Sequence, residues 1–126
     1  MAPTQRLKKL LKQAANGCAE SQFLVSECFR EGKEGAIDND PQHIQMAKWY
    51  LQAAQQGHVE AQAMAGAIYR VRYDAFAERG DEKRMEEAAK LSFQWFLKAG
   101  KAGFAEACYN LGDLYEDGIG VPEPNI

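Results

Sequence analysis

Three cysteines and two histidines are among the side chains of this sequence that could act as nucleophiles or bind a metal ion. Cys18, Cys28 and Cys108 follow no metal-ligand spacing. A Cys–His nucleophile pair would have to use His43 or His58. Cys18 and Cys28 would lie about 15 Å apart on one helix, which is too far for a disulfide. Three reduced thiols in a cytosolic protein are the simplest interpretation.

The elements that must position these side chains are helices. The 126 residues include twenty alanines but only ten valines, isoleucines and threonines combined. Alanine is the best helix former, whereas β-branched residues favour sheets, so a single all-α domain over residues 1–126 is predicted. The start signals are Asp40–Pro41 and Asp81. Helices are expected over the ranges 4–16, 18–31, 41–56, 58–79, 82–101 and 104–117.

The chain repeats itself. Three stretches align without gaps, namely 10–22, 50–62 and 96–108. Their glycines at Gly17, Gly57 and Gly103 are 40 and 46 residues apart, which is a period typical of a solenoid of helix pairs. Each glycine suits the left-handed residue that ends a helix. Small residues are expected where antiparallel helices touch: Ala14, Ala53, Ala54, Ala61, Ala65, Gly66, Gly100, Ala107 and Gly112.

Residues 47–62, AKWYLQAAQQGHVEAQ, and residues 111–121, LGDLYEDGIGV, carry a family resemblance. The pattern resembles the Sel1-like repeat, a relative of the tetratricopeptide repeat. The resemblance implies a right-handed α–α superhelix of three units at about 4–32, 41–80 and 82–121, followed by a tail at 122–126. It also implies a protein-interaction scaffold that binds its partner along a concave groove.

Departures from the pattern predict how the units differ. Lys9 stands where the other units have tryptophan, which indicates a solvent-facing first unit. The second unit lacks the Gly-x-Gly-Val ending, so its second helix is expected to continue to Arg79. The last helix is expected to keep an uncovered face that exposes an apolar patch: Leu111, Leu114, Ile119 or Val121. Aromatic residues at 29, 69 and 115 are expected to fill space between units.

The repeat separates the residues that catalysis would need. Cys18 and His58 hold equivalent positions in adjacent units, on the order of 10 Å apart. The paired acids, Glu86–Glu87 and Glu116–Asp117, point to different faces of their helices. Gly118 and Gly120 follow a helix, whereas a phosphate-binding glycine loop precedes one. No catalytic, cofactor-binding or metal-binding residue is therefore predicted, and the protein is expected not to be an enzyme.

The net charge of −3 hides a gradient. Residues 1–16 carry four bases and no acid, whereas residues 103–126 carry five acids and no base. One helix face in each unit combines lysines and amides and contains no acid. The candidate groove residues on it are Lys8, Lys12, Gln45, Lys48, Gln52, Gln94 and Lys98. Leu91 holds the position of Gln45 on the third unit's part of this stripe. Lysines and amides at helical spacing predict a groove for an acidic or carboxylate-ended peptide, although a solvated helix face has the same composition.

Other interpretations remain open. A secondary candidate surface combines arginines with aromatic residues: Arg70, Arg72, Tyr73, Phe76 and Arg79. Tyr73 and Phe76 could instead pack on the next helix. A homodimer through the last repeat, or a monomer whose tail folds back, is also expected. An accessory subunit of an enzyme complex is the alternative function. No nucleic-acid or membrane partner is predicted, and the absence of a visible signal peptide or membrane span predicts a cytoplasmic location.

Overall fold

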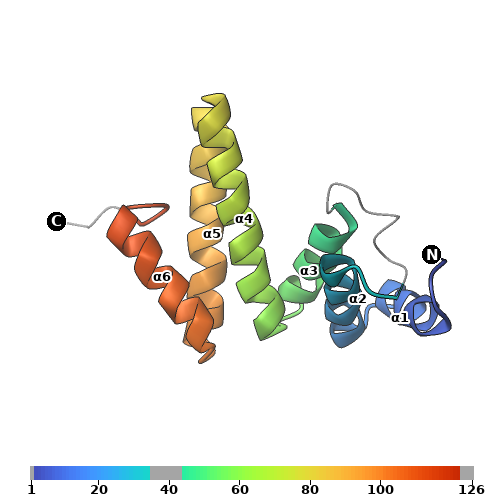
Figure 1. Cartoon of the computed structure of the whole chain (residues 1–126). Coiled ribbons are helices and arrows are strands. Elements are labelled where there is room, and N and C mark those ends of the chain that lie inside the picture. The colour runs from blue at the N-terminus through green and yellow to red at the C-terminus, as the bar shows by residue number, and fades with distance from the viewer. Residues whose placement is uncertain (1, 35–43, 123–126) are drawn as a thin grey trace. The chain divides into compact units, whose positions relative to one another are not determined.

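Six helices make up the described part of the chain, residues 2–34 and 44–122 of this computed structural model (Figure 1). They are α1 (Gln5–Ala15), α2 (Ala19–Glu31), α3 (Ile44–Gln55), α4 (Val59–Arg79), α5 (Glu82–Lys101) and α6 (Ala105–Asp117). These ranges contain no strand, so the predicted all-α class is confirmed. The expected start of a helix at Asp40–Pro41 lies outside the described residues, as does most of the predicted tail. The predicted extension of the second unit's helix to Arg79 is confirmed.

Glycines end the first helix of each pair, as predicted. Gly17, Gly57 and Gly103 have φ angles of 94°, 93° and 90°, in the left-handed region that glycine adopts without strain. Side chains accept hydrogen bonds at several helix starts. Thr4 accepts a hydrogen bond from the Leu7 amide, and the predicted cap Asp81 accepts one from the amide at position 84.

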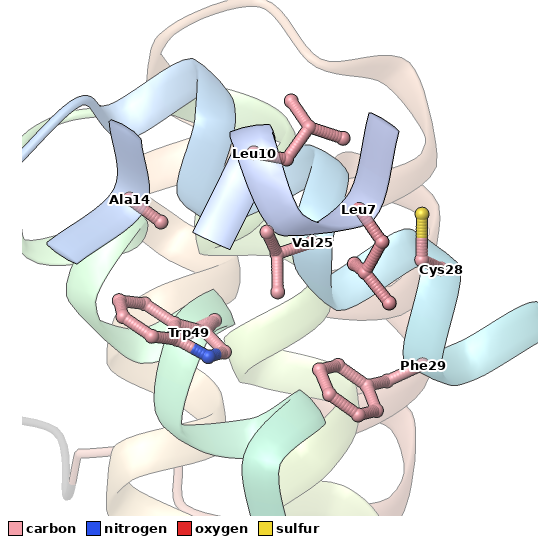
Figure 2. Close-up of a cluster of buried hydrophobic side chains, with 7 residues drawn as sticks. All are labelled: Leu7, Leu10, Ala14, Val25, Cys28, Phe29 and Trp49. Carbon is pink, nitrogen blue, oxygen red and sulfur yellow. The ribbon is translucent and has the colours of Figure 1, made fainter. Parts of the chain in front are cut away.

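The chain forms two compact units, Met1–Ala61 and Gln62–Ile126. We call these the first and the second unit, and we keep the word repeat for the three sequence repeats. In the first unit, α2 packs against both α1 and α3. Figure 2 shows its core, in which Trp49 of α3 lies against side chains from the two preceding helices. The cluster comprises Leu7, Leu10, Ala14, Val25, Cys28, Phe29 and Trp49. Burial of this kind stabilises by about 25 cal/mol per Å² of apolar surface, so this cluster holds the three helices together.

In the second unit, α4 and α5 approach closely because Gly66 has no side chain. A Cβ atom there would lie 2.8 Å from the ring of Phe96, and the Ser92 hydroxyl donates a 2.8 Å hydrogen bond to the Gly66 carbonyl. Across α5 and α6, Gly100 lies beside Cys108 in the same way. The predicted small-residue contacts are therefore found at these positions. Gly112 is the exception, because it is exposed.

The prediction of an exposed apolar patch on the last repeat is wrong. Leu114 and Ile119 are buried, and Leu111 and Val121 are half-buried. Leu114 shares one face of α6 with the buried Ala107, seven residues earlier, and lines a groove together with Phe96 of α5. The turn after α6 brings Ile119 back, because its amide donates to the Leu114 carbonyl and the following glycine lies against α5. Tyr115 was expected to fill space between units, but it is 55% exposed and meets Phe93 only edge-on.

Candidate protein-interaction surface

The acid-free stripe predicted from the sequence lies largely in solvent. On α1, Lys8 and Lys12 are exposed; on α3, Lys48 is exposed. The amides Gln45 and Gln52 of α3 are half-buried. In the second unit, the stripe residues of α5 are all exposed: Leu91, Gln94 and Lys98. Each unit therefore offers lysine and amide groups on a helix surface that a partner can reach.

A tryptophan supports one stripe lysine in each unit. The ammonium of Lys48 lies 4.8 Å from the ring centre of Trp49, and that of Lys98 lies 4.9 Å from the ring centre of Trp95. Trp49 and Trp95 are equivalent in the repeat, whereas the two lysines come from different positions relative to them. A cation–π contact is worth about 0.5–1 kcal/mol at an exposed site, so each ring restrains a charge that stays accessible.

Gln52 has a role that the sequence did not indicate. The buried Gln22 of α2 donates to the Ala14 carbonyl at 3.1 Å and also lies 3.4 Å from the side-chain oxygen of Gln52. Gln56 in turn donates to Gln22 at 2.9 Å. These amides satisfy one another and join the three helices of the first unit. Gln52 therefore contributes to packing as well as to the stripe.

The secondary candidate residues are partly occupied by contacts within α4. The Arg70 guanidinium lies 2.5 Å from the Asp74 carboxylate and 5.2 Å from the ring centre of Tyr73. Arg72 lies 5.2 Å from the ring centre of Tyr69. Arg79, at the end of the helix, is exposed. Ion pairing with Asp74 leaves Arg72 as the more available guanidinium of the two.

A shallow groove between α4 and α5 brings Arg72 and Phe76 together with Leu91 of the stripe. Its volume is about 290 Å³, and it is lined by Tyr69, Arg72, Phe76, Arg84, Glu87, Ala88 and Leu91. Sequence reasoning missed Arg84, whose guanidinium lies 6.0 Å from the ring centre of Phe76. Its spacing of seven residues from Leu91 places both on one face of α5, and that spacing could have identified it.

A polar cluster around the buried Tyr50 joins α2 to α3. The Tyr50 hydroxyl donates to Glu27 at 3.0 Å and accepts from Arg30 at 3.1 Å, and these two charged groups lie 2.6 Å apart. Burial, together with the negative charge of Glu27, raises the pKa of Tyr50 above its ordinary value. The cluster is satisfied internally, so it positions α3 and presents no free reactive group.

The cysteines and histidines considered as nucleophiles or metal ligands are not grouped into a site within the described residues. Cys18, Cys28 and Cys108 are free thiols. The His58 ring lies 2.8 Å from Glu20 through Nε2, and its Nδ1 accepts a hydrogen bond from the Ala61 amide at the start of α4. Within residues 2–34 and 44–122, no three His, Cys, Asp or Glu side chains are grouped so that they could hold a metal ion. His43 lies outside these ranges.

No helix of the described ranges has the length and apolar character needed to cross a membrane. The paired acids named from the sequence are exposed: Glu86, Glu87, Glu116 and Asp117. On the described surface, the features that a partner could contact are the acid-free stripe and the shallow groove between α4 and α5.

The Sel1 repeat matches three consecutive segments of the chain: 19–58, 59–104 and 105–126. These segments together cover most of its length. The chain belongs to the Sel1 repeat family. The fold is accordingly the all-α solenoid of helix-pair repeats that the resemblance implied. Sel1 repeat proteins generally mediate protein–protein interactions, and the division into units at 4–32, 41–80 and 82–121 stays a prediction.

Solved structures share this fold. A Sel1 repeat protein from Oxalobacter formigenes is 34% identical, with a TM-score of 0.67, over 96% of this chain and 80% of the other. A protective antigen of uropathogenic Escherichia coli with an SLR fold is 26% identical, with a TM-score of 0.67, over 91% of this chain and 22% of the other.

Two curated relatives come from Schizosaccharomyces pombe. Chitin synthase regulatory factors 3 and 1 are each 31% identical over 121 residues, which are 95% and 93% of this chain. The match spans only 12% and 24% of these longer proteins. The relatives therefore bear on this Sel1 repeat segment, and their whole activities belong to much longer chains.

Proposed function

We propose that this Sel1 repeat protein is a non-enzymatic scaffold that binds an acidic peptide or protein through its acid-free stripe. The observation that carries the proposal is the pairing of an exposed lysine with a tryptophan in each unit, Lys48 with Trp49 and Lys98 with Trp95. A restrained ammonium loses less side-chain entropy when it meets a carboxylate than a fully mobile one does. Neighbouring amides would hydrogen-bond the peptide backbone.

The groove between α4 and α5 supports the same proposal. Arg72 and Arg84 flank an apolar floor that includes Leu91, and Glu87 is the one acid among the residues that line it. Arginine and aromatic side chains are the usual anchors of protein interfaces. An acidic segment with one apolar side chain fits this composition better than a basic one.

The test uses synthetic glutamate-rich peptides, with and without a free C-terminal carboxylate, in fluorescence anisotropy titrations. The binding variant is Lys12→Glu/Lys48→Glu/Lys98→Glu. A matched control, Lys83→Glu/Lys90→Glu/Lys101→Glu, makes the same charge change at exposed positions outside the stripe. We expect at least a tenfold loss of affinity in the first variant and less than threefold in the control. Equal losses in both, or none in the first, would refute the stripe as the binding surface.

A second candidate function is regulation of an enzyme by contact. It is favoured by the names of the two fission-yeast relatives, which are regulatory factors of chitin synthase. Under this proposal the chain has no activity alone and changes the rate of an enzyme partner, in a cytoplasmic location. The partner recovered on an immobilised wild-type chain would be assayed with and without added chain. A rate that does not respond to the chain contradicts the regulatory role.

A further inference from the structure

In both units, the second helix of one repeat is hydrogen-bonded to the first helix of the next repeat through the same two repeat positions. Between α2 and α3, the Ser26 hydroxyl donates to the Met46 carbonyl at 3.1 Å. Between α4 and α5, Ser92 donates to the carbonyl of Gly66 at 2.8 Å. Ser26 and Gly66 are 40 residues apart and Met46 and Ser92 are 46 apart, as are the repeats themselves. One stacking register is therefore used twice.

Helix α6 is the second helix of the third repeat. Within the described residues, no helix packs on the face of α6 that corresponds to the α3-covered face of α2. Gly112 is equivalent to Ser26 and Gly66, yet it is exposed, and a Cβ atom there would meet nothing within 4 Å. Tyr109 is 76% exposed, whereas its equivalent on α2, Phe23, is 7% exposed against α3. We call this surface the open face of α6; it comprises Tyr109, Gly112, Asp113 and Glu116.

The charge of the open face indicates that a helix packing on it should be basic. On α2 the two outer positions hold Glu27 and Arg30, which neutralise each other. On α6 the same positions hold two acids, Asp113 and Glu116, and the helix contains no base. Neither acid forms an ion pair within the described part of the chain. A helix that stacks here in the register of α3 would gain by bringing positive charge.

Helix α1 matches this requirement in the same register. Arg6 stands at the position of Met46, and Lys9 at the position of Trp49. Both side chains are exposed; Arg6 lies 3.8 Å from Glu34 and also interacts with the Cys28 thiol. The whole of α1 carries four bases and no acid, whereas α6 carries four acids and no base.

We propose that the open face of α6 binds helix α1 of a second copy of this chain, head to tail, in the register in which α2 receives α3. A symmetric pairing of two α6 faces would place acids against acids, so the expected homodimer is replaced by a heterologous contact. Such a contact can repeat from copy to copy, so the mass should increase with concentration. Salt weakens it because its charges are exposed.

The test is a charge exchange followed by analytical ultracentrifugation at 10–500 µM (about the range suited to weak association) in low and high salt. The variants are Arg6→Glu/Lys9→Glu and Asp113→Lys/Glu116→Lys, and circular dichroism checks that each one folds. We expect the wild type to associate in low salt and to dissociate at least tenfold more readily in high salt. Each variant alone should be monomeric, and an equimolar mixture of the two should associate again.

Two further proteins make the outcome decisive. The fourfold exchange, with both faces reversed, should associate by itself. A control with Lys83→Glu/Lys101→Glu should behave as the wild type does. A wild type that stays monomeric throughout, a mixture that does not associate, or association that strengthens with salt would each overturn the proposal. This proposal depends on Arg6 and Lys9 of α1, whereas the stripe uses Lys8 and Lys12 of the same helix. The two sets of variants change different residues, so either proposal can fail without the other.

Discussion

Gly66 and Gly112 occupy equivalent repeat positions, and the same substitution should have opposite effects at the two sites. At Gly66, the alanine Cβ would lie 2.8 Å from a Phe96 ring that is itself 3% exposed. Overpacking of this kind costs about 1–3 kcal/mol, and better helix propensity returns about 0.5–1 kcal/mol. Gly66→Ala should therefore lower the free energy of unfolding by about 1 kcal/mol, and by no more than about 2.5 kcal/mol. Gly112→Ala should raise it by about 0.5–1 kcal/mol, because the added methyl meets nothing.

The measurement is urea unfolding followed by far-ultraviolet circular dichroism, at low protein concentration and high salt so that association does not contribute. A loss of this size moves the midpoint down by about 0.5–1 M urea at an ordinary slope. Phe96→Leu in the Gly66→Ala background provides the matched test, because a non-additive recovery would locate the strain at this contact. A Gly66→Ala midpoint equal to or above that of the wild type would refute the reasoning, as would a destabilised Gly112→Ala.

Three other substitutions or treatments test the structure. Tyr50→Phe should cost about 1 kcal/mol of stability at neutral pH. Because the pKa of Tyr50 is raised in the folded state, the unfolded state loses this proton first, so wild-type stability should fall above about pH 10. Urea midpoints measured from about pH 8 to 11 should fall more steeply for the wild type than for the variant. His58→Ala should cost about 1 kcal/mol by removing the acceptor for the first turn of α4, and His58→Asn should recover part of it in thermal melts; no difference between the two would exclude the capping role. Iodoacetamide at neutral pH should alkylate Cys18 before Cys28. The Ser21 hydroxyl lowers the pKa of the exposed Cys18 thiol, whereas burial raises the pKa of Cys28. Equal alkylation rates of the two thiols in peptide mass spectrometry would contradict this.

The helices and their ends follow from short stretches of sequence. Gly57 ends α3, and Asp81 begins α5, through conformational preferences that involve a few neighbouring residues. The exposure of Lys48 and Lys98 follows in the same way from helical periodicity. The cation–π contacts of these lysines were not predicted, because they depend on the rotamers that the side chains adopt against their tryptophans.

The candidate surface was predicted only in part. The stripe residues are where periodicity places them, but the groove beside Leu91 also uses Arg84, which the sequence did not single out. Gln52 was predicted for the stripe alone, yet it also contacts the buried Gln22, which is 30 residues away. Contacts of this range depend on how two helices pack, which no single helix pattern specifies.

The sequence by itself determined the repeat, the helix pairs and the distribution of charge, because each depends on residue type and spacing. Only the tertiary structure decided which equivalent positions are covered. Gly66 contacts Phe96 while Gly112 is exposed, and Leu114 and Ile119 are buried although the sequence suggested a free apolar patch. The physical reason is that coverage requires a partner surface from another segment: α5 supplies it for Leu114, the turn after α6 returns Ile119 toward the helices, and no described helix supplies it for Gly112.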